Sequence, residues 1–132
     1  EDAVWSKGKR FFDALRPGVE PDGLESAGTV RTHRKAHLRQ VIRLLEGTDL
    51  FVFTLGLTEA WVHRESGTVY PTAPGTVAGV YDPAVHVFKN FTFPEIYEDF
   101  VAFRALMKEL NPAVRFLLTV SPLPLTATAC VR

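Results

Sequence analysis

Two short apolar runs constrain the fold of this chain more than any other feature. Leu50–Leu55 reads LFVFTL and Phe116–Val120 reads FLLTV, and small, polar or imino residues follow each run at once. A continuous apolar run of this length, bounded by turn residues, is typical of a strand buried on both faces, as the strands of parallel sheets are. The two runs therefore predict an α/β fold built around a parallel sheet.

Two helices are predicted around these strands. The first runs from about Thr29 to Glu46 and stops at Gly47. The second follows a capping box formed by Thr92 and Glu95, and it ends at Asn111–Pro112 because the residue before a proline avoids the helical conformation. The order helix, strand, loop, helix, strand predicts a parallel strand pair with a right-handed crossover. The apolar faces are Leu38, Val41, Ile42 and Leu45 on the first helix and Ile96, Phe100, Phe103, Met107 and Leu110 on the second.

The segments outside these elements are dense in Gly and Pro. Residues 1–28 are therefore expected to form an irregular N-terminal arm ahead of a domain over residues 29–132. Residues 62–90 predict a long loop, with a small hairpin between Ala60–His63 and Thr68–Tyr70. A loop of this length inside a compact domain is usually functional or disordered, and its aromatic residues favour an ordered one.

Charge and cysteine content exclude several classes of protein. Fifteen basic residues balance fifteen acidic ones, which removes the electrostatic footprint of a dedicated nucleic-acid binder. No apolar run has the length of a membrane-spanning helix. Cys130 is the only cysteine, so an internal disulfide is impossible, and His33 and His37 lack a third metal ligand. No metal or other cofactor is expected, and the absence of a signal-peptide pattern fits a cytoplasmic location.

Small and polar residues at the ends of the two predicted strands mark a candidate site. In open α/β sheets, ligands bind beyond the carboxyl ends of the strands. Gly56, Thr58 and Glu59 follow the first strand, and Ser121 follows the second. Gly56 either lets a ligand approach the backbone or makes the turn that leaves the strand. Glu59 either orients a catalytic group, or caps or pairs with an arginine.

Three further candidates lie in or beside the long loop. His63 and His86 either line a substrate cleft or are ordinary surface residues. Asn90 either donates to a substrate oxygen or fixes the turn before the second helix. Ser121 is followed by Pro122 and Pro124, which prevent the helix that a nucleophile elbow requires. Ser121 is therefore predicted to bind substrate and not to act as the nucleophile.

Several stretches of the sequence resemble the bacterial GSCFA family. They are DLFVFTLGLTEAW at Asp49–Trp61, VYPTAPG at Val69–Gly75, FKNFT at Phe88–Thr92, LNP at Leu110–Pro112 and FLLTVSPLPLTAT at Phe116–Thr128. The resemblance implies a place among the SGNH/GDSL-type hydrolases, with a flavodoxin-like, three-layer α/β/α fold. It also implies acyl transfer by a serine nucleophile after the first strand, oxyanion donors from a glycine and an asparagine, and a histidine base near the C-terminus.

The sequence departs from that pattern in its catalytic residues. Neither the nucleophile motif nor an Asp-x-x-His pair occurs, so the resemblance implies that the nucleophile and the base lie outside Glu1–Arg132. The chain would then be the central portion of a larger hydrolase-like domain and catalytically silent by itself, since no serine stands beside a histidine in a recognisable pattern. A sheet without its first strand would also leave an open edge or apolar face that a second copy can cover.

The resemblance implies oxyanion roles for two of the candidate residues. Gly56-Leu57-Thr58-Glu59 stands where the superfamily has Gly-x-Asn-Asp, so Gly56 and Thr58 are the oxyanion candidates. The implied substrate is a small-molecule or carbohydrate ester, namely acylated carbohydrate or a related cell-surface compound. The alternative is a non-catalytic carbohydrate-binding or interaction domain that has kept the hydrolase fold. The candidate substrate-binding residues are Glu59, His63, His86, Asn90 and Ser121.

Overall fold

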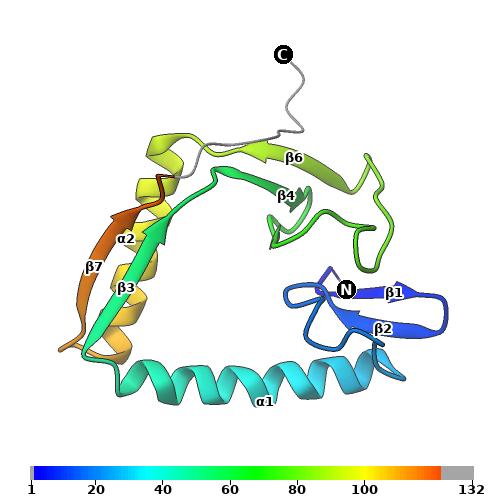
Figure 1. Cartoon of the computed structure of the whole chain (residues 1–132), viewed down its shortest axis with the longest axis horizontal. Helices are drawn as coiled ribbons and strands as arrows, with labels where there is room; N and C mark the ends of the chain where they lie inside the picture. Colours follow the sequence, from blue (N-terminus) through cyan, green and yellow to red (C-terminus); the bar gives the residue numbers. More distant parts are fainter. Residues whose placement is uncertain (1, 123–132) are drawn as a thin grey trace. The chain divides into compact units, whose positions relative to one another are not determined.

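The computed structural model describes residues 2–122 of the chain and divides it into two compact units. The first unit comprises residues 1–37 and 59–90, and the second comprises residues 38–58 and 91–132. Helix α1 (Ala27–Glu46) belongs to the first unit through His37 and to the second from Leu38 onward (Figure 1).

The second unit contains the parallel strand pair that the sequence predicts. Strand β3 (Leu50–Leu55) runs parallel to β7 (Arg115–Val120), with Leu50 opposite Arg115 and Leu55 opposite Val120. Helix α2 (Phe93–Leu110) lies between them in sequence and runs beside the pair (Figure 1). The predicted strands, the predicted second helix and the parallel direction are all confirmed.

Specific hydrogen bonds fix both ends of α2. The Glu95 carboxylate accepts bonds of 2.8 Å from both the backbone N–H and the hydroxyl of Thr92, which confirms the predicted helix start. At the other end, the Asn111 amide donates to the carbonyls of Leu45 and Thr48, at 3.0 and 2.9 Å. Asn111 therefore ties the end of α2 to the end of α1.

Helix α2 covers one face of the β3–β7 pair with aromatic side chains. The ring centroids of Phe51 and Phe103 are 5.4 Å apart, and those of Phe53 and Phe100 are 5.9 Å apart. Phe116 of β7 meets Phe100 at 6.1 Å with the rings nearly perpendicular. This geometry is favourable for aromatic pairs, and it confirms the predicted packing of the helix on the sheet.

The opposite face of the same pair is open in the described part of the chain. Val52 is 56% exposed and Leu117 is 49% exposed, and the hydroxyls of Thr54 and Thr119 bond to each other at 2.8 Å across it. The expectation that these strands are buried on both faces is therefore wrong for residues 2–122. Two strands and one covering helix give a mixed α/β arrangement, and the expected three layers are not formed by these residues.

The N-terminal segment forms a hairpin where irregular structure was expected. Strand β1 (Val4–Lys7) pairs antiparallel with β2 (Arg10–Asp13), which places Trp5 opposite Phe12. Both side chains are buried, at 7% and 5% exposure. Gly8 has a φ of 61°, so this glycine makes the tight turn between the strands.

Three short strands form a second sheet in the first unit. Strand β4 (Glu59–His63) lies between β5 (Val69–Tyr70) and β6 (His86–Asn90), and both pairings are antiparallel. The β4–β5 hairpin confirms the prediction for this stretch, whereas β6 occupies residues predicted to be loop. The remaining loop is attached to β1, because Gly79 N–H donates to the Ser6 carbonyl at 3.0 Å.

A small apolar core joins the hairpin and the second sheet. Trp5 packs against Tyr70 with ring centroids 5.0 Å apart, whereas Val30 of α1, which is 1% exposed, is buried outside this cluster. The predicted apolar face of α1 is only partly covered, since Leu38 is 49% exposed and Ile42 is 47% exposed. The core cluster consists of Trp5, Phe12, Ala14, Tyr70 and Ala78.

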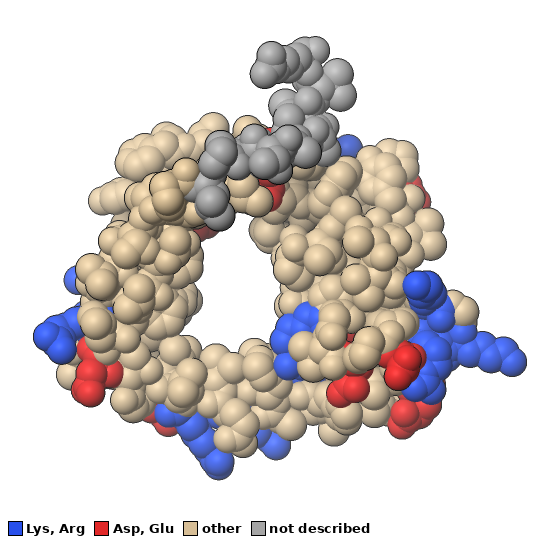
Figure 2. Space-filling view, in the orientation of Figure 1, with Lys and Arg blue, Asp and Glu red and all other residues tan. Residues whose placement is uncertain are grey.

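Charged side chains lie at the surface in small groups of both signs (Figure 2). One group is partly buried: the carboxylate of Asp13 accepts hydrogen bonds from the guanidinium groups of Arg34 and Arg16. Burial raises the pKa of Asp13, but hydrogen bonds from Arg34 and from the Leu15 backbone outweigh it, so the pKa lies below its usual value. Within residues 2–122, neither helix is both long enough and apolar enough to span a membrane.

Candidate functional site

Gly56 and Ser121 lie at the same end of the parallel pair in the second unit. Ser121 N–H donates to the carbonyl of Leu55 at 2.8 Å, so the hydrogen-bond ladder continues one residue past Val120. Ser121 is therefore placed next to the point where the chain leaves β3 at Gly56. This is the position predicted from the rule that sites form at the carboxyl ends of parallel strands.

The backbone conformation at position 56 does not require a glycine. Its φ is not positive, it is exposed, and an added Cβ would meet nothing within 4 Å. The turn that leaves β3 could therefore be made by another residue, which weakens the turn explanation. Open space in front of the Gly56 backbone leaves room for a ligand.

Thr58 is held in place through its main chain. Its carbonyl accepts the N–H of Phe91 at 2.8 Å, one residue before the Thr92 cap of α2. The Thr58 residue is exposed, and its hydroxyl can donate one hydrogen bond. The strand-end group, defined as Gly56, Thr58 and Ser121, therefore combines an accessible backbone with hydroxyl groups.

The four candidate residues from the first unit share one face of the β5–β4–β6 sheet. Glu59 lies directly opposite Asn90, and His63 lies directly opposite His86. Directly opposite residues point to the same side of a sheet, and so do residues two apart along a strand. Trp61 lies between Glu59 and His63 on this face, opposite both Tyr70 and Phe88. We call this surface the aromatic face: Glu59, Trp61, His63, Tyr70, His86, Phe88 and Asn90.

His63 ends strand β4, as the predicted hairpin implies, but the placement of His86 and Asn90 in the long loop is wrong. Both lie in strand β6, and Asn90 pairs with Glu59 instead of forming a turn. The pairing of β4 with β6 is non-local, so sequence spacing does not reveal it. Ser121, the fifth predicted substrate-binding residue, belongs to the other unit.

Hydrogen bonds assign the donor and acceptor roles of the two histidines. Asp82 N–H donates to Nδ1 of His86 at 3.2 Å, and Ser66 N–H donates to Nδ1 of His63 at 3.2 Å. In each neutral ring the hydrogen must then sit on Nε2. Both side chains are suited to donating a hydrogen bond through Nε2, and His86 is only 7% exposed.

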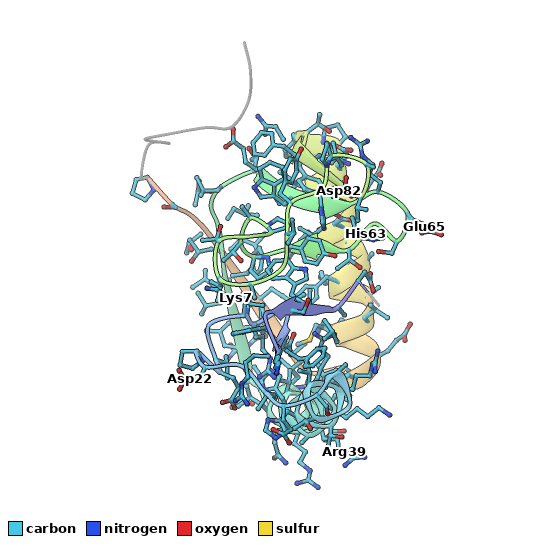
Figure 3. The ribbon with its side chains drawn as sticks, turned by 90° about the vertical axis from the view of Figure 1, so that its right-hand side faces the viewer. Lys7, Asp22, Arg39, His63, Glu65 and Asp82 are labelled. Atoms are coloured by element: carbon cyan, nitrogen blue, oxygen red, sulfur yellow. The ribbon has the colours of Figure 1, made fainter. Side chains whose placement is uncertain are left out.

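Ser66 is a contact of His63 that sequence reasoning missed. Its Oγ lies 3.1 Å from Nδ1 of His63, in the turn between β4 and β5, where the neighbouring Glu65 points away from the sheet (Figure 3). The expectation that no serine stands beside a histidine is therefore wrong, and the i, i+3 spacing across the predicted turn was the available signal. The Ser66 hydroxyl also lies 2.6 Å from the carboxylate of Asp2, which is the better acceptor. The arrangement therefore anchors a turn and does not prepare a nucleophile.

Asp2 fastens the β4–β5 turn to the start of β1. Its carboxylate accepts the hydroxyl of Thr68 at 2.5 Å in addition to that of Ser66, and its carbonyl accepts the Tyr70 hydroxyl at 2.8 Å. The hydrogen bonds from Ser66 and Thr68 lower the pKa of Asp2 from 3.8 to about 2. Because the folded-state pKa is depressed, the ionised carboxylate stabilises the fold above about pH 4.

Replacing Asp2 by asparagine is expected to lower the free energy of unfolding at pH 7 by about 1 kcal/mol or less, because this carboxylate is largely solvated. The difference from the unchanged protein should shrink as the pH falls from about 4 toward 2, where the native carboxylate is protonated. Urea titrations of both proteins at several pH values measure it. Asp22→Asn, at an exposed aspartate, is the control and should show no such pH dependence.

The other polar features of the first unit do not form a substrate site. A cavity of about 20 Å³ beside Asp13 and Glu20 has room for roughly one water molecule. His33, considered above as a metal ligand, lies 3.7 Å from Glu20. Among residues 2–122, no three His, Cys, Asp or Glu side chains gather as a metal site would require.

The sequence of the chain, which includes the strand-end group and the aromatic face, was compared with known proteins. No curated protein and no solved structure matches the chain. The model of the GSCFA family matches residues 2–132, a range that includes both groups and essentially the whole sequence. The chain therefore belongs to the GSCFA family.

Proposed function

We propose that this chain supplies oxyanion and substrate-binding residues to an SGNH-like esterase or acyl hydrolase that acts on acylated carbohydrate or a related cell-surface ester. The observation that carries the proposal is the Ser121–Leu55 hydrogen bond, which brings the second strand end beside the open backbone of Gly56. Flavodoxin-like hydrolases place their chemistry at this edge of the sheet. The parallel β3–β7 pair would be part of such a sheet, completed by further strands.

The proposed chemistry is acyl transfer through a tetrahedral intermediate. A serine supplied from outside Glu1–Arg132 would attack the ester carbonyl, while a histidine, also from outside, takes the serine proton and passes it to the departing alcohol. Water, activated by the same histidine, would then cleave the acyl-serine ester and release the acid. The backbone N–H of Gly56 and the hydroxyl of Thr58 would donate hydrogen bonds to the oxyanion that forms. Such donors accelerate the reaction because they are already oriented toward the developing charge.

In a longer protein that carries the nucleophile and base, Thr58→Ala is expected to lower kcat without unfolding the domain. Loss of one oxyanion donor typically costs about 2.7–4 kcal/mol, and a hydroxyl with a shorter reach than an amide should fall at or below the lower end. Steady-state hydrolysis of p-nitrophenyl acetate measures the effect. Thr119→Ala is the matched control, because it removes the same hydroxyl from inside β7 and should leave kcat unchanged. An unchanged kcat in Thr58→Ala would remove Thr58 from the mechanism.

The second candidate function is a carbohydrate-binding or interaction domain without catalysis. It is favoured by the aromatic face, which combines Trp61 and Phe88 with a carboxylate and an amide. Binding through such a face needs no nucleophile. A longer protein that binds carbohydrate but never hydrolyses an ester would support this function over the first.

A further inference from the structure

The aromatic face changes from a buried end to an open end along the β5–β4–β6 sheet. Tyr70 and His86 are 3% and 7% exposed, and Trp5 covers Tyr70. At the other end, Glu59 and Phe88 are half-buried and Asn90 is exposed. The buried end belongs to the core of the first unit, so only the open end can meet a ligand.

Trp61 connects the two ends: it is half-buried and packs against the core cluster, and it also contacts the rings at the open end. Its ring lies 5.4 Å from that of Phe88 on the neighbouring strand and 5.0 Å from that of Tyr81, which comes from the loop before β6. Both contacts are edge-on, at 63° and 69°. Tyr81 is 46% exposed although it takes part in this cluster. The cluster therefore keeps aromatic surface in contact with solvent beside the sheet.

A polar pair borders the aromatic rings. Glu59 and Asn90 lie directly opposite each other, two residues from Trp61 and Phe88 respectively, on the same face. A carboxylate accepts hydrogen bonds, whereas an amide both accepts and donates them. Sugar hydroxyls need both kinds of partner, and the C–H face of a pyranose ring is apolar. A quaternary ammonium ion would use aromatic rings and a carboxylate but has no use for a donor.

From these contacts we infer that the cluster of Trp61, Tyr81 and Phe88 is a platform for an oligosaccharide: a pyranose ring stacks on the exposed ring of Tyr81, and Glu59 and Asn90 bind its hydroxyls. The inference rests on the proposed function, since it takes from that function the class of ligand, a carbohydrate. An open platform suits a chain of sugar units, because such a chain can extend beyond the protein surface. Trp61 is a binding residue in this scheme and takes no part in ester cleavage.

The chain has only two tryptophans, Trp5 and Trp61, so its two indole N–H resonances report directly on the platform. Xylotetraose, cellotetraose and chitotetraose, with and without O-acetyl groups, are titrated into the ¹⁵N-labelled 132-residue chain. The resonance of Trp61, assigned with Trp61→Phe, should shift saturably with at least one of them. The resonance of Trp5 should stay in place, because this side chain is 7% exposed.

Matched variants test the role of the platform. Tyr81→Ala should weaken binding at least tenfold, whereas Tyr97→Ala, at a tyrosine of α2 that is 59% exposed, should leave it unchanged. The inference is overturned if no oligosaccharide shifts Trp61 at concentrations up to ~10 mM. It is also overturned if tetramethylammonium shifts Trp61 and the sugars do not.

Ester hydrolysis by a longer protein separates this inference from the proposed function. Sugar binding at Trp61 without any hydrolysis supports the platform and contradicts the esterase. Hydrolysis of p-nitrophenyl acetate without sugar binding supports the esterase and overturns the platform.

Discussion

The 132-residue chain alone is expected to hydrolyse p-nitrophenyl acetate several orders of magnitude more slowly than a longer protein that carries the serine and the histidine of the proposed mechanism. Acyl transfer needs a nucleophile and a base in contact, and without them only the residual effect of the oxyanion donors and of binding is left. Ser66 does not replace the nucleophile, because its hydroxyl lies 2.6 Å from the carboxylate of Asp2. Parallel steady-state assays of the two proteins measure the difference.

Background hydrolysis must be separated from catalysis in this comparison. Imidazole groups cleave activated esters slowly, so His63→Ala and Ser66→Ala are assayed beside the unchanged chain. Each substitution should lower the hydrolysis rate of the 132-residue chain only slightly, by the background reaction that one solvent-accessible side chain contributes. Rates comparable to the longer protein that disappear in Ser66→Ala would show that the chain carries its own nucleophile.

Gly23→Ala is expected to destabilise the first unit by about 3 kcal/mol. Gly23 has a φ of 67°, and an added Cβ would lie 2.7 Å from the ring of Phe12 and 2.9 Å from Cβ of Arg10. The substitution therefore combines backbone strain with overlap against a buried ring. Urea unfolding followed by tryptophan fluorescence measures the change, since Trp5 lies opposite Phe12.

Gly67→Ala is the matched control for this substitution. Gly67 has a similar φ of 72°, but an added Cβ there meets nothing within 4 Å. It should lower the free energy of unfolding by about 1 kcal/mol, which is the backbone term alone. Equal losses in the two variants would show that Phe12 moves aside without penalty.

Elements with strong local signals were predictable from the sequence. The bounds of Leu50–Leu55 follow from its apolar run, and the start of α2 follows from the Thr92 and Glu95 capping box. The parallel pairing of β3 with β7 follows from the order of elements. The carboxyl-end position of Gly56 and Ser121 follows in turn from that pairing.

Features that depend on non-local pairing were not predictable. Gly8 looks the same in an irregular arm as in a hairpin turn, and only the pairing of Trp5 with Phe12 separates the two. The aromatic face requires the register of β4 against β6, which no local pattern gives. The exposure of Val52 and Leu117 depends on what covers the second face of the sheet, and the two apolar runs do not encode that.

The distance along the chain between β3 and β7 has a consequence for folding. Thr54 and Thr119 bond to each other although they are 65 positions apart in the sequence, and the strands β4, β5 and β6 and helix α2 are inserted in between. Closing so long a loop is entropically unfavourable unless the inserted strands fold first and bring its ends together. During synthesis, β3 leaves the ribosome well before β7 exists, with an uncharged apolar sequence that has no partner strand. During the interval between the two strands, the nascent chain therefore presents an unpaired apolar strand of the kind that promotes aggregation.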